Sequence, residues 1–183
     1  MPTAFAGSPL LPPLLQINAL TLAALLSAAC VTDLRTRRIP NGLIVAGLLT
    51  GVVLAVVTDG LWTGAQRAVG GFATGMLIWM PFWLLRMMGG GDVKLFATGA
   101  IWLGPTGAVE AAMLAGLSGG VLSLLYLLRQ YGVPHTLQRI AIGVRYPAVL
   151  REAAPTPWDR RMPYALAMAA GLAGAARWPG LLL

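Results

Sequence analysis

The sequence is short of acidic residues, with six Asp and Glu against 13 Lys and Arg in 183 residues. Charged residues make up 10% of the chain, whereas a soluble globular domain carries about 25%. So few charges would not cover the apolar surface of a soluble fold. The single cysteine, Cys30, excludes an internal disulfide and paired CxxC zinc ligands. The single histidine, His135, lacks companions for a metal site and is expected on the surface.

Long apolar runs are what the sequence has instead, and hydrophobic residues make up 57% of it. A helix that crosses the hydrocarbon core needs about 20 apolar residues. We therefore predict an all-α, polytopic integral membrane protein, with residues 1–183 forming one domain. Its expected transmembrane helices number about six, at residues 14–32, 42–58, 67–86, 92–104, 106–128 and 162–182. The segment Met1 to Pro13 has no basic residue, so the first run is expected to be a retained anchor rather than a cleaved signal peptide.

The fourth run is short, and this bears on the depth of Asp92. The stretch from Asp92 to Leu103, 12 residues long, covers about 18 Å of a hydrocarbon core about 30 Å thick. We therefore expect Asp92 to sit slightly below the membrane surface.

The basic residues fall mainly on one side of these six spans. If the segment from Asp33 is cytoplasmic, that side collects 11 basic residues and the other side keeps only Arg67 and Arg177. This bias predicts that both termini lie outside. The net charge of +7 then reflects topology and attraction to anionic lipid rather than binding of nucleic acid. The cytoplasmic segment 129–161 alternates apolar and arginine residues and is expected to rest on that lipid.

Glycine pairs spaced by four residues predict close helix contacts at Gly47/Gly51, Gly71/Gly75 and Gly116/Gly120. Among the acids, Asp59 and Asp159 are interpreted as loop residues. Glu110 is expected to face the outer interface or to cap the start of the fifth span.

Asp33 and Asp92 are the acids that need a chemical explanation. Asp33 ends the first span and opens a polar loop over residues 33–41, and Asp92 follows the triplet Gly89 to Gly91. The predicted topology puts both at one depth on the cytoplasmic side, where ionisable residues are functional candidates. Two carboxylates that share a site do not both ionise easily, and such a pair performs acid–base chemistry on water. The alternatives are a helix-end charge for Asp33 and an ion-pair partner of Lys94 for Asp92.

The neighbours of these acids have expected roles of their own. Gly89 and Gly91 permit close backbone approach, so an extended substrate could lie beside Asp92. Lys94 is two residues further on, off the face of Asp92 on a helix, and is expected to support the site or to set topology. Cys30 is interpreted as a small packing residue.

Two of these segments resemble motifs of a known family. Gly89-x-Gly91-Asp92, followed by Val93-Lys94-Leu95, resembles the GxGD motif of the type IV prepilin leader peptidases. The segment from Asp33 to Ile39-Pro40-Asn41 is similar to the first aspartate segment of that family. Pro163-Tyr164 is similar to a Pro-Tyr/Phe-Gly element in its last helix, although Ala165 stands where glycine is usual.

The resemblance implies an aspartic endopeptidase of the bacterial cytoplasmic membrane that removes the leader of prepilin or pseudopilin precursors on the cytoplasmic side. It implies Asp33 and Asp92 as catalytic residues and no cofactor. It further implies a supporting motif of Gly89, Gly91, Lys94, Ile39, Pro40, Asn41, Pro163 and Tyr164. Larger members also N-methylate the product and carry an extra domain with CxxC pairs. Because this chain has only Cys30, it resembles the short, peptidase-only type of tight-adherence (Flp) pilus systems, and no methylation is expected.

Two other functions stay open from the residues. A different GxGD-type intramembrane protease would share the two acids but would not explain Ile39-Pro40-Asn41. A small proton or cation transporter component would use the acids as carriers, yet no polar residues continue a path to the other side. The sequence leaves the substrate pilin and the oligomeric state undefined.

Overall fold

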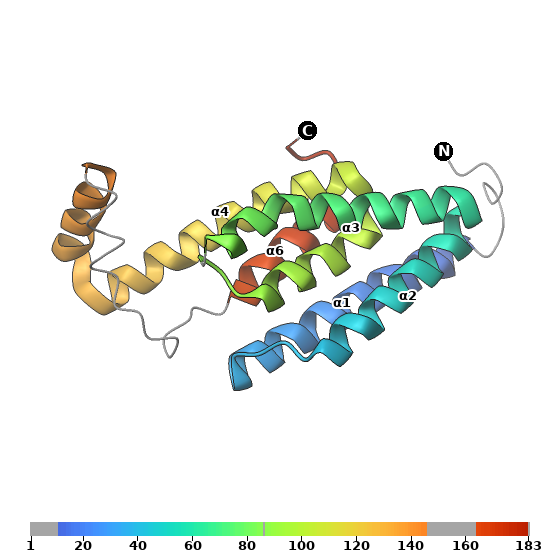
Figure 1. Cartoon of the computed structure of the whole chain (residues 1–183), viewed down its shortest axis with the longest axis horizontal. Helices are drawn as coiled ribbons and strands as arrows, with labels where there is room; N and C mark the ends of the chain where they lie inside the picture. The colour runs from blue at the N-terminus through green and yellow to red at the C-terminus, as the bar shows by residue number, and fades with distance from the viewer. Residues whose placement is uncertain (1–10, 86, 146–163, 183) are drawn as a thin grey trace. The chain divides into compact units, whose positions relative to one another are not determined.

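The computed structural model describes residues 11–85, 87–145 and 164–182. These residues form helices and no strand, so the all-α prediction is confirmed for this part of the chain (Figure 1). The helices are α1 (Leu11–Thr36), α2 (Asn41–Asp59), α3 (Leu61–Leu84), α4 (Gly90–Arg145) and α6 (Tyr164–Arg177).

The chain divides into two compact units, one of residues 1–118 with 163–183 and one of residues 119–162. In the second unit the described part, up to Arg145, is helical and contains Gly132 with a φ of 73°. This corrects the prediction of a loop from residue 129; the segment contains three Arg and two Gln, which favour helix. Residues 146–161 of the predicted loop lie outside the described residues. The contact of this segment with anionic lipid stays a prediction.

Three helical segments within the described residues are long and apolar enough to cross a membrane, namely Gln16–Thr36, Asn41–Asp59 and Gly90–Leu125. The predicted count of six is not confirmed. Helix α6 has 14 residues and a length of about 21 Å, which is shorter than the hydrocarbon core of about 30 Å.

Two predicted boundaries are wrong, and single residues explain why. Helix α1 continues to Thr36, so Asp33 lies on its last turn rather than in a loop. It ends where Arg37 adopts a left-handed backbone with a φ of 53°. Helix α3 begins at Leu61, six residues before the predicted start. The turn between α2 and α3 needs only Gly60, whose φ of 86° is readily adopted by glycine.

Helix α4 is not one straight rod. Gly104, with a φ of 74°, lies in the left-handed region, and Pro105 follows it. The contacts of α6 show the consequence, because Leu172 lies against Gly99 while the adjacent Gly171 lies against Ala111. In a straight helix those two partners would be about 18 Å apart. Residues 90–103 and 105–118 therefore run side by side and in opposite directions (Figure 1).

Small residues let the helices of the first unit approach closely. A side chain at Gly47 would meet Leu25, and one at Gly71 would meet the carbonyl oxygen of Ala100. The close contacts predicted for Gly47/Gly51 and Gly71/Gly75 are therefore present within the chain. Added side chains at Gly116 and Gly120 would meet nothing within 4 Å, so contacts at that pair stay a prediction.

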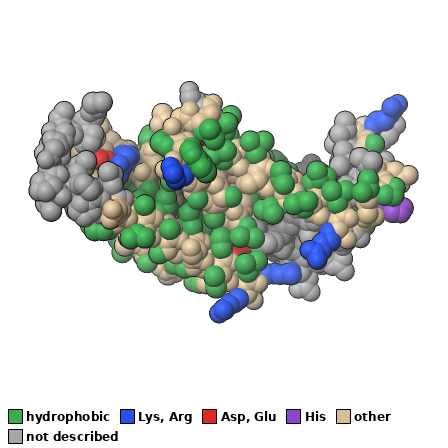
Figure 2. Space-filling model, turned by 180° about the vertical axis from the view of Figure 1, so that it is seen from behind, with side chains coloured by type: hydrophobic (Ala, Val, Ile, Leu, Met, Phe, Trp, Pro, Cys, Tyr) green, Lys and Arg blue, Asp and Glu red, His purple; other side chains and the backbone are tan. Residues whose placement is uncertain are grey.

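The outer surface is apolar, as a lipid-facing surface requires. Figure 2 shows hydrophobic side chains spread over the face it presents, with few charges among them. On α2 the exposed residues recur at near-helical spacing: Val45, Leu49, Val53 and Val57.

Candidate active site

Asp33 is a buried carboxylate at the end of α1, with 9% of its surface exposed. Ala165, in the first turn of α6, directs its backbone N–H toward this carboxyl group, and the guanidinium of Arg37 is a charged neighbour. Its second oxygen, Oδ2, is buried and has no hydrogen-bond partner among the described residues. A buried polar atom of this kind is costly and calls for an explanation.

The connection after Asp33 is tight and ordered by the backbone. The N–H of Arg37 donates to the carbonyl oxygen of Asp33 at 2.8 Å. Pro40 then stands at the N-cap of α2 in an extended conformation, with φ −61° and ψ 133°. Ile39 is half-buried, whereas Pro40 and Asn41 are exposed. Ile39 is thus the member of this motif that packs inward.

The glycine triplet forms the start of α4. The N–H of Asp92 donates to the carbonyl oxygen of Gly89 at 3.2 Å, which places the acid in the first helical turn. A carboxylate there interacts favourably with the helix dipole. Gly90 has no room for a side chain, because an added Cβ would lie 3.0 Å from Nε1 of Trp83 at the end of α3.

Gly91, in the glycine–aspartate motif of α4, lies close to Ile39 in the motif that follows Asp33. The position of an added Cβ on Gly91 is 3.6 Å from Cβ of Ile39, which is ordinary van der Waals contact. Ile39 in turn packs against a buried cluster formed by α1, α2, α4 and α6: Leu25, Ala29, Ile44, Leu95 and Ala165. Ala29 precedes Asp33 by one helical turn and Leu95 follows Asp92 by about one turn. Both aspartates therefore lie at the same end of the first unit.

The remaining predicted residues vary in their placement. Lys94 is exposed, and Gly89 and Tyr164 are half-buried. Pro163 lies outside the described residues. The catalytic and supporting roles of the predicted site residues stay predictions.

Sequence reasoning missed the contribution of Ala165. This residue is fully buried, and besides its N–H on Asp33 its carbonyl oxygen accepts from Sγ of Cys30 at 3.7 Å. Cys30 is thus more than a packing residue. The third motif, where Ala165 replaces the usual glycine, was the available signal. A backbone contact cannot be predicted from residue type, because every residue other than proline offers the same N–H and carbonyl groups.

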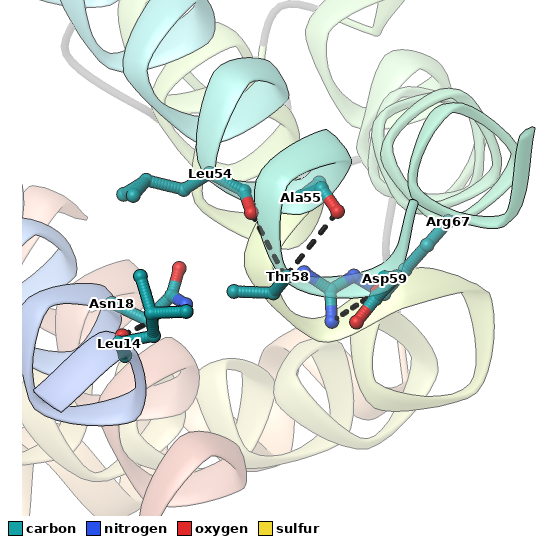
Figure 3. Close-up of polar contacts among 7 residues, drawn as sticks. All are labelled: Leu14, Asn18, Leu54, Ala55, Thr58, Asp59 and Arg67. Atoms are coloured by element: carbon teal, nitrogen blue, oxygen red, sulfur yellow. Dashed lines mark hydrogen bonds and ion pairs between the residues drawn. The ribbon is translucent and has the colours of Figure 1, made fainter. Parts of the chain in front are cut away.

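The opposite end of the first unit also holds two acids, and both have partners. Asp59 pairs with Arg67 at 2.7 Å, and Arg67 also donates to Oγ1 of Thr58 at 3.5 Å (Figure 3). The interpretation of Asp59 as a loop acid is wrong, because it is the last residue of α2 and its charge is compensated by α3.

Glu110 also differs from expectation. It is 3% exposed rather than at the interface, and its two oxygens accept from the N–H groups of Gly180 at 2.9 Å and Leu182 at 3.1 Å. The reversal at Gly104 turns it inward, toward the turn after α6.

The fold and the site together define the class of protein. It is an all-α protein with three candidate membrane spans and two aspartates gathered at one end from α1 and α4. Across the described residues no group of three or more His, Cys, Asp or Glu is arranged to hold a metal ion.

Comparison with known proteins gives the family. Residues 20–124, more than half of the chain, match the model of the type IV leader peptidase family, and the chain belongs to this family. It is 29% identical to the prepilin leader peptidase/N-methyltransferase of Dickeya chrysanthemi over 121 residues, which cover 63% of this chain and 42% of the relative. It is 30% identical over 128 residues to the protein of the same description from Pectobacterium carotovorum subsp. carotovorum, covering 66% and 45%. The matches thus span less than half the length of these relatives. No solved structure matches the chain.

Proposed function

We propose that this chain is an aspartic endopeptidase that removes the leader peptide of type IV pilin-like precursors at the cytoplasmic face of the bacterial cytoplasmic membrane. The observation that carries the proposal is the nearness of Gly91 to Ile39, whose Cβ lies 3.6 Å from the position of a Cβ added on Gly91. It ties the glycine–aspartate turn of α4 to the end of α1, where the buried Asp33 keeps an oxygen without a protein partner.

The chemistry follows from two carboxyl groups in one apolar site. One is ionised and takes a proton from water, whose oxygen then attacks the carbonyl carbon of the scissile peptide bond. The other is protonated and polarises the carbonyl oxygen, because two neighbouring carboxylates do not both ionise easily. The C–N bond then breaks, and the leaving amine takes up the proton. The unpartnered Oδ2 of Asp33 fits a role in holding water or substrate.

The flanking glycines support access of an extended substrate. Gly90 and Gly91 are half-buried and present backbone rather than side chain next to Asp92. Lys94 is exposed on the same first turn, in keeping with a supporting or topogenic charge on the cytoplasmic side. Anionic lipid is the proposed partner of the basic residues on that side.

The test is co-expression with a type IV pilin-like precursor, with leader removal followed on a gel. The wild type, Asp33→Asn and Asp92→Asn are compared at equal membrane levels, with Asp59→Asn as a matched control at the other end. Both site variants are expected to leave the precursor uncut, and the control is expected to process it. Processing by either site variant would refute the dyad.

The position of the cut separates this proposal from its alternatives. Cleavage at the membrane border after a basic leader supports it, whereas cleavage deep within a helix identifies another kind of intramembrane GxGD protease. Ion flux in proteoliposomes without any cleavage identifies a transporter. Mass spectrometry of the new N-terminus reports methylation, and we propose an unmodified amine.

A further inference from the structure

The geometry points to Glu110 as a positioning residue for Asp33, acting through α6 from the opposite end of the first unit. The inference rests on the proposed function for the meaning of Asp33. The contact itself is tested below without reference to peptidase activity.

Glu110 fastens the turn that follows α6. Its two carboxylate oxygens accept from Gly180 at 2.9 Å and from Leu182 at 3.1 Å. Gly180 has a φ of 79°, a conformation that glycine adopts and that other residues adopt at a cost. Because Glu110 is 3% exposed, water does not readily replace these donors. An ionised carboxylate that receives two backbone N–H groups is a strong hydrogen-bonded contact.

The same face of α4 holds α6 along its length. A side chain on Gly171 would meet the carbonyl oxygen of Ala111, so the two backbones lie in close contact. About two turns further along α4, Oγ of Ser118 donates to the carbonyl oxygen of Ala167 at 3.1 Å. The contacts at Glu110, Gly171 and Ser118 together fix the axial position and rotation of α6.

The other end of α6 meets Asp33. Ala165 directs its N–H to the carboxyl group and accepts from Sγ of Cys30 at 3.7 Å. A helix transmits an axial shift along its length, because its rise per residue is fixed. Release of the turn at Gly180 removes one of the contacts that hold α6, and we expect it to shift Ala165 relative to Cys30 and Asp33.

Cys30 is the single cysteine of the sequence and reports on that displacement. The rate of maleimide labelling of Cys30 is measured in purified full-length protein for the wild type, Glu110→Gln and Glu110→Ala. We expect labelling to rise about tenfold in Glu110→Ala, since a hydrogen-bonded charged contact is removed. Glu110→Gln keeps one acceptor oxygen and is expected to give an intermediate rate.

Two further variants keep the test decisive if Glu110→Ala does not fold. Gly180→Ala strains the turn while it leaves Glu110 in place, and it is expected to raise labelling as well. Asp59→Asn removes an acid contact at the same end without touching α6, so labelling at the wild-type rate is expected. Rates in Glu110→Gln and Gly180→Ala that match the wild type, or an equal rise in Asp59→Asn, would overturn the inference.

Processing of a pilin-like precursor supplies the second readout. Glu110→Gln is expected to lower kcat with little change in KM, because the binding surface is kept while Asp33 is misplaced. Faster labelling with unchanged kcat would show that the contact holds α6 without serving Asp33, which contradicts the positioning role. A wild type that cuts no precursor would remove the proposed function, and the labelling rates would still decide whether Glu110 holds α6.

Discussion

The acids at the two ends of the first unit differ in whether their carboxylate oxygens have partners. At one end Asp59 pairs with Arg67 at 2.7 Å, and Glu110 receives two backbone N–H groups. At the other end Asp33 is also withdrawn from solvent, yet its Oδ2 has no hydrogen-bond partner within the part of the chain that the structure describes. Acids that hold a fold together are expected to be fully compensated.

The difference matches what the proposed chemistry requires of Asp33. Leaving a buried polar atom without a partner costs on the order of 1–3 kcal/mol. An apolar chain with six acids has little reason to bear that cost unless the atom meets water or substrate. The comparison therefore favours Asp33 for chemistry, and Asp59 and Glu110 for architecture.

The largest expected effect is on turnover by the two candidate catalytic acids. Asp33→Asn and Asp92→Asn should each lower kcat for precursor cleavage by at least about 10²–10⁴-fold, the usual contribution of a general acid or base. The double variant should be no slower than either single variant, because residues that act as a unit are not additive. Turnover of purified enzyme measures this, and multiplicative losses would show that the acids act separately.

A smaller effect is expected at the junction of the two motifs. Gly91→Leu should lower kcat by about 10²-fold, because it would push α4 away from Ile39 and a displacement of about 1 Å is enough for such a loss. Gly91→Ala is the matched control, since its Cβ would reach Ile39 at 3.6 Å, an ordinary contact. Equal activity of the two variants would mean that the contact does not set the site.

The smallest expected effect is on stability at the other end. Asp59→Asn should lower the free energy of unfolding by about 1–2 kcal/mol, since Arg67 loses its charged partner but stays partly exposed. Precursor cleavage by the remaining folded protein should stay at the wild-type level. Denaturant unfolding in detergent gives the free energy of unfolding. A loss of cleavage without a loss of stability would contradict a purely structural role of Asp59.

Much of the architecture could be predicted from local sequence. Apolar runs gave the helical class, and the motifs around Asp33 and Asp92 gave the family, which residues 20–124 bear out. Helix ends were harder, because single backbone conformations decide them. Helix α1 runs past Asp33 and ends only at the left-handed Arg37, and Gly60 alone makes the turn between α2 and α3.

The contacts of α6 could not be predicted at all. Ala165 serves Asp33 through its backbone, and any residue type offers the same N–H group. Glu110 finds its partners 70 and 72 residues away, at Gly180 and Leu182, because the chain reverses at Gly104. Neither composition nor periodicity encodes which turn a buried carboxylate will meet.

We propose that Asp33 acts in catalysis rather than in holding the fold. A paired measurement on the Asp33→Asn variant tests this. Denaturant unfolding in detergent and precursor cleavage are recorded on the same purified protein. We predict that cleavage is lost while the free energy of unfolding is equal to or above that of the wild type, because the amide removes a buried charge and keeps an acceptor for Ala165. Retained cleavage in a destabilised Asp33→Asn protein would contradict the catalytic role of Asp33.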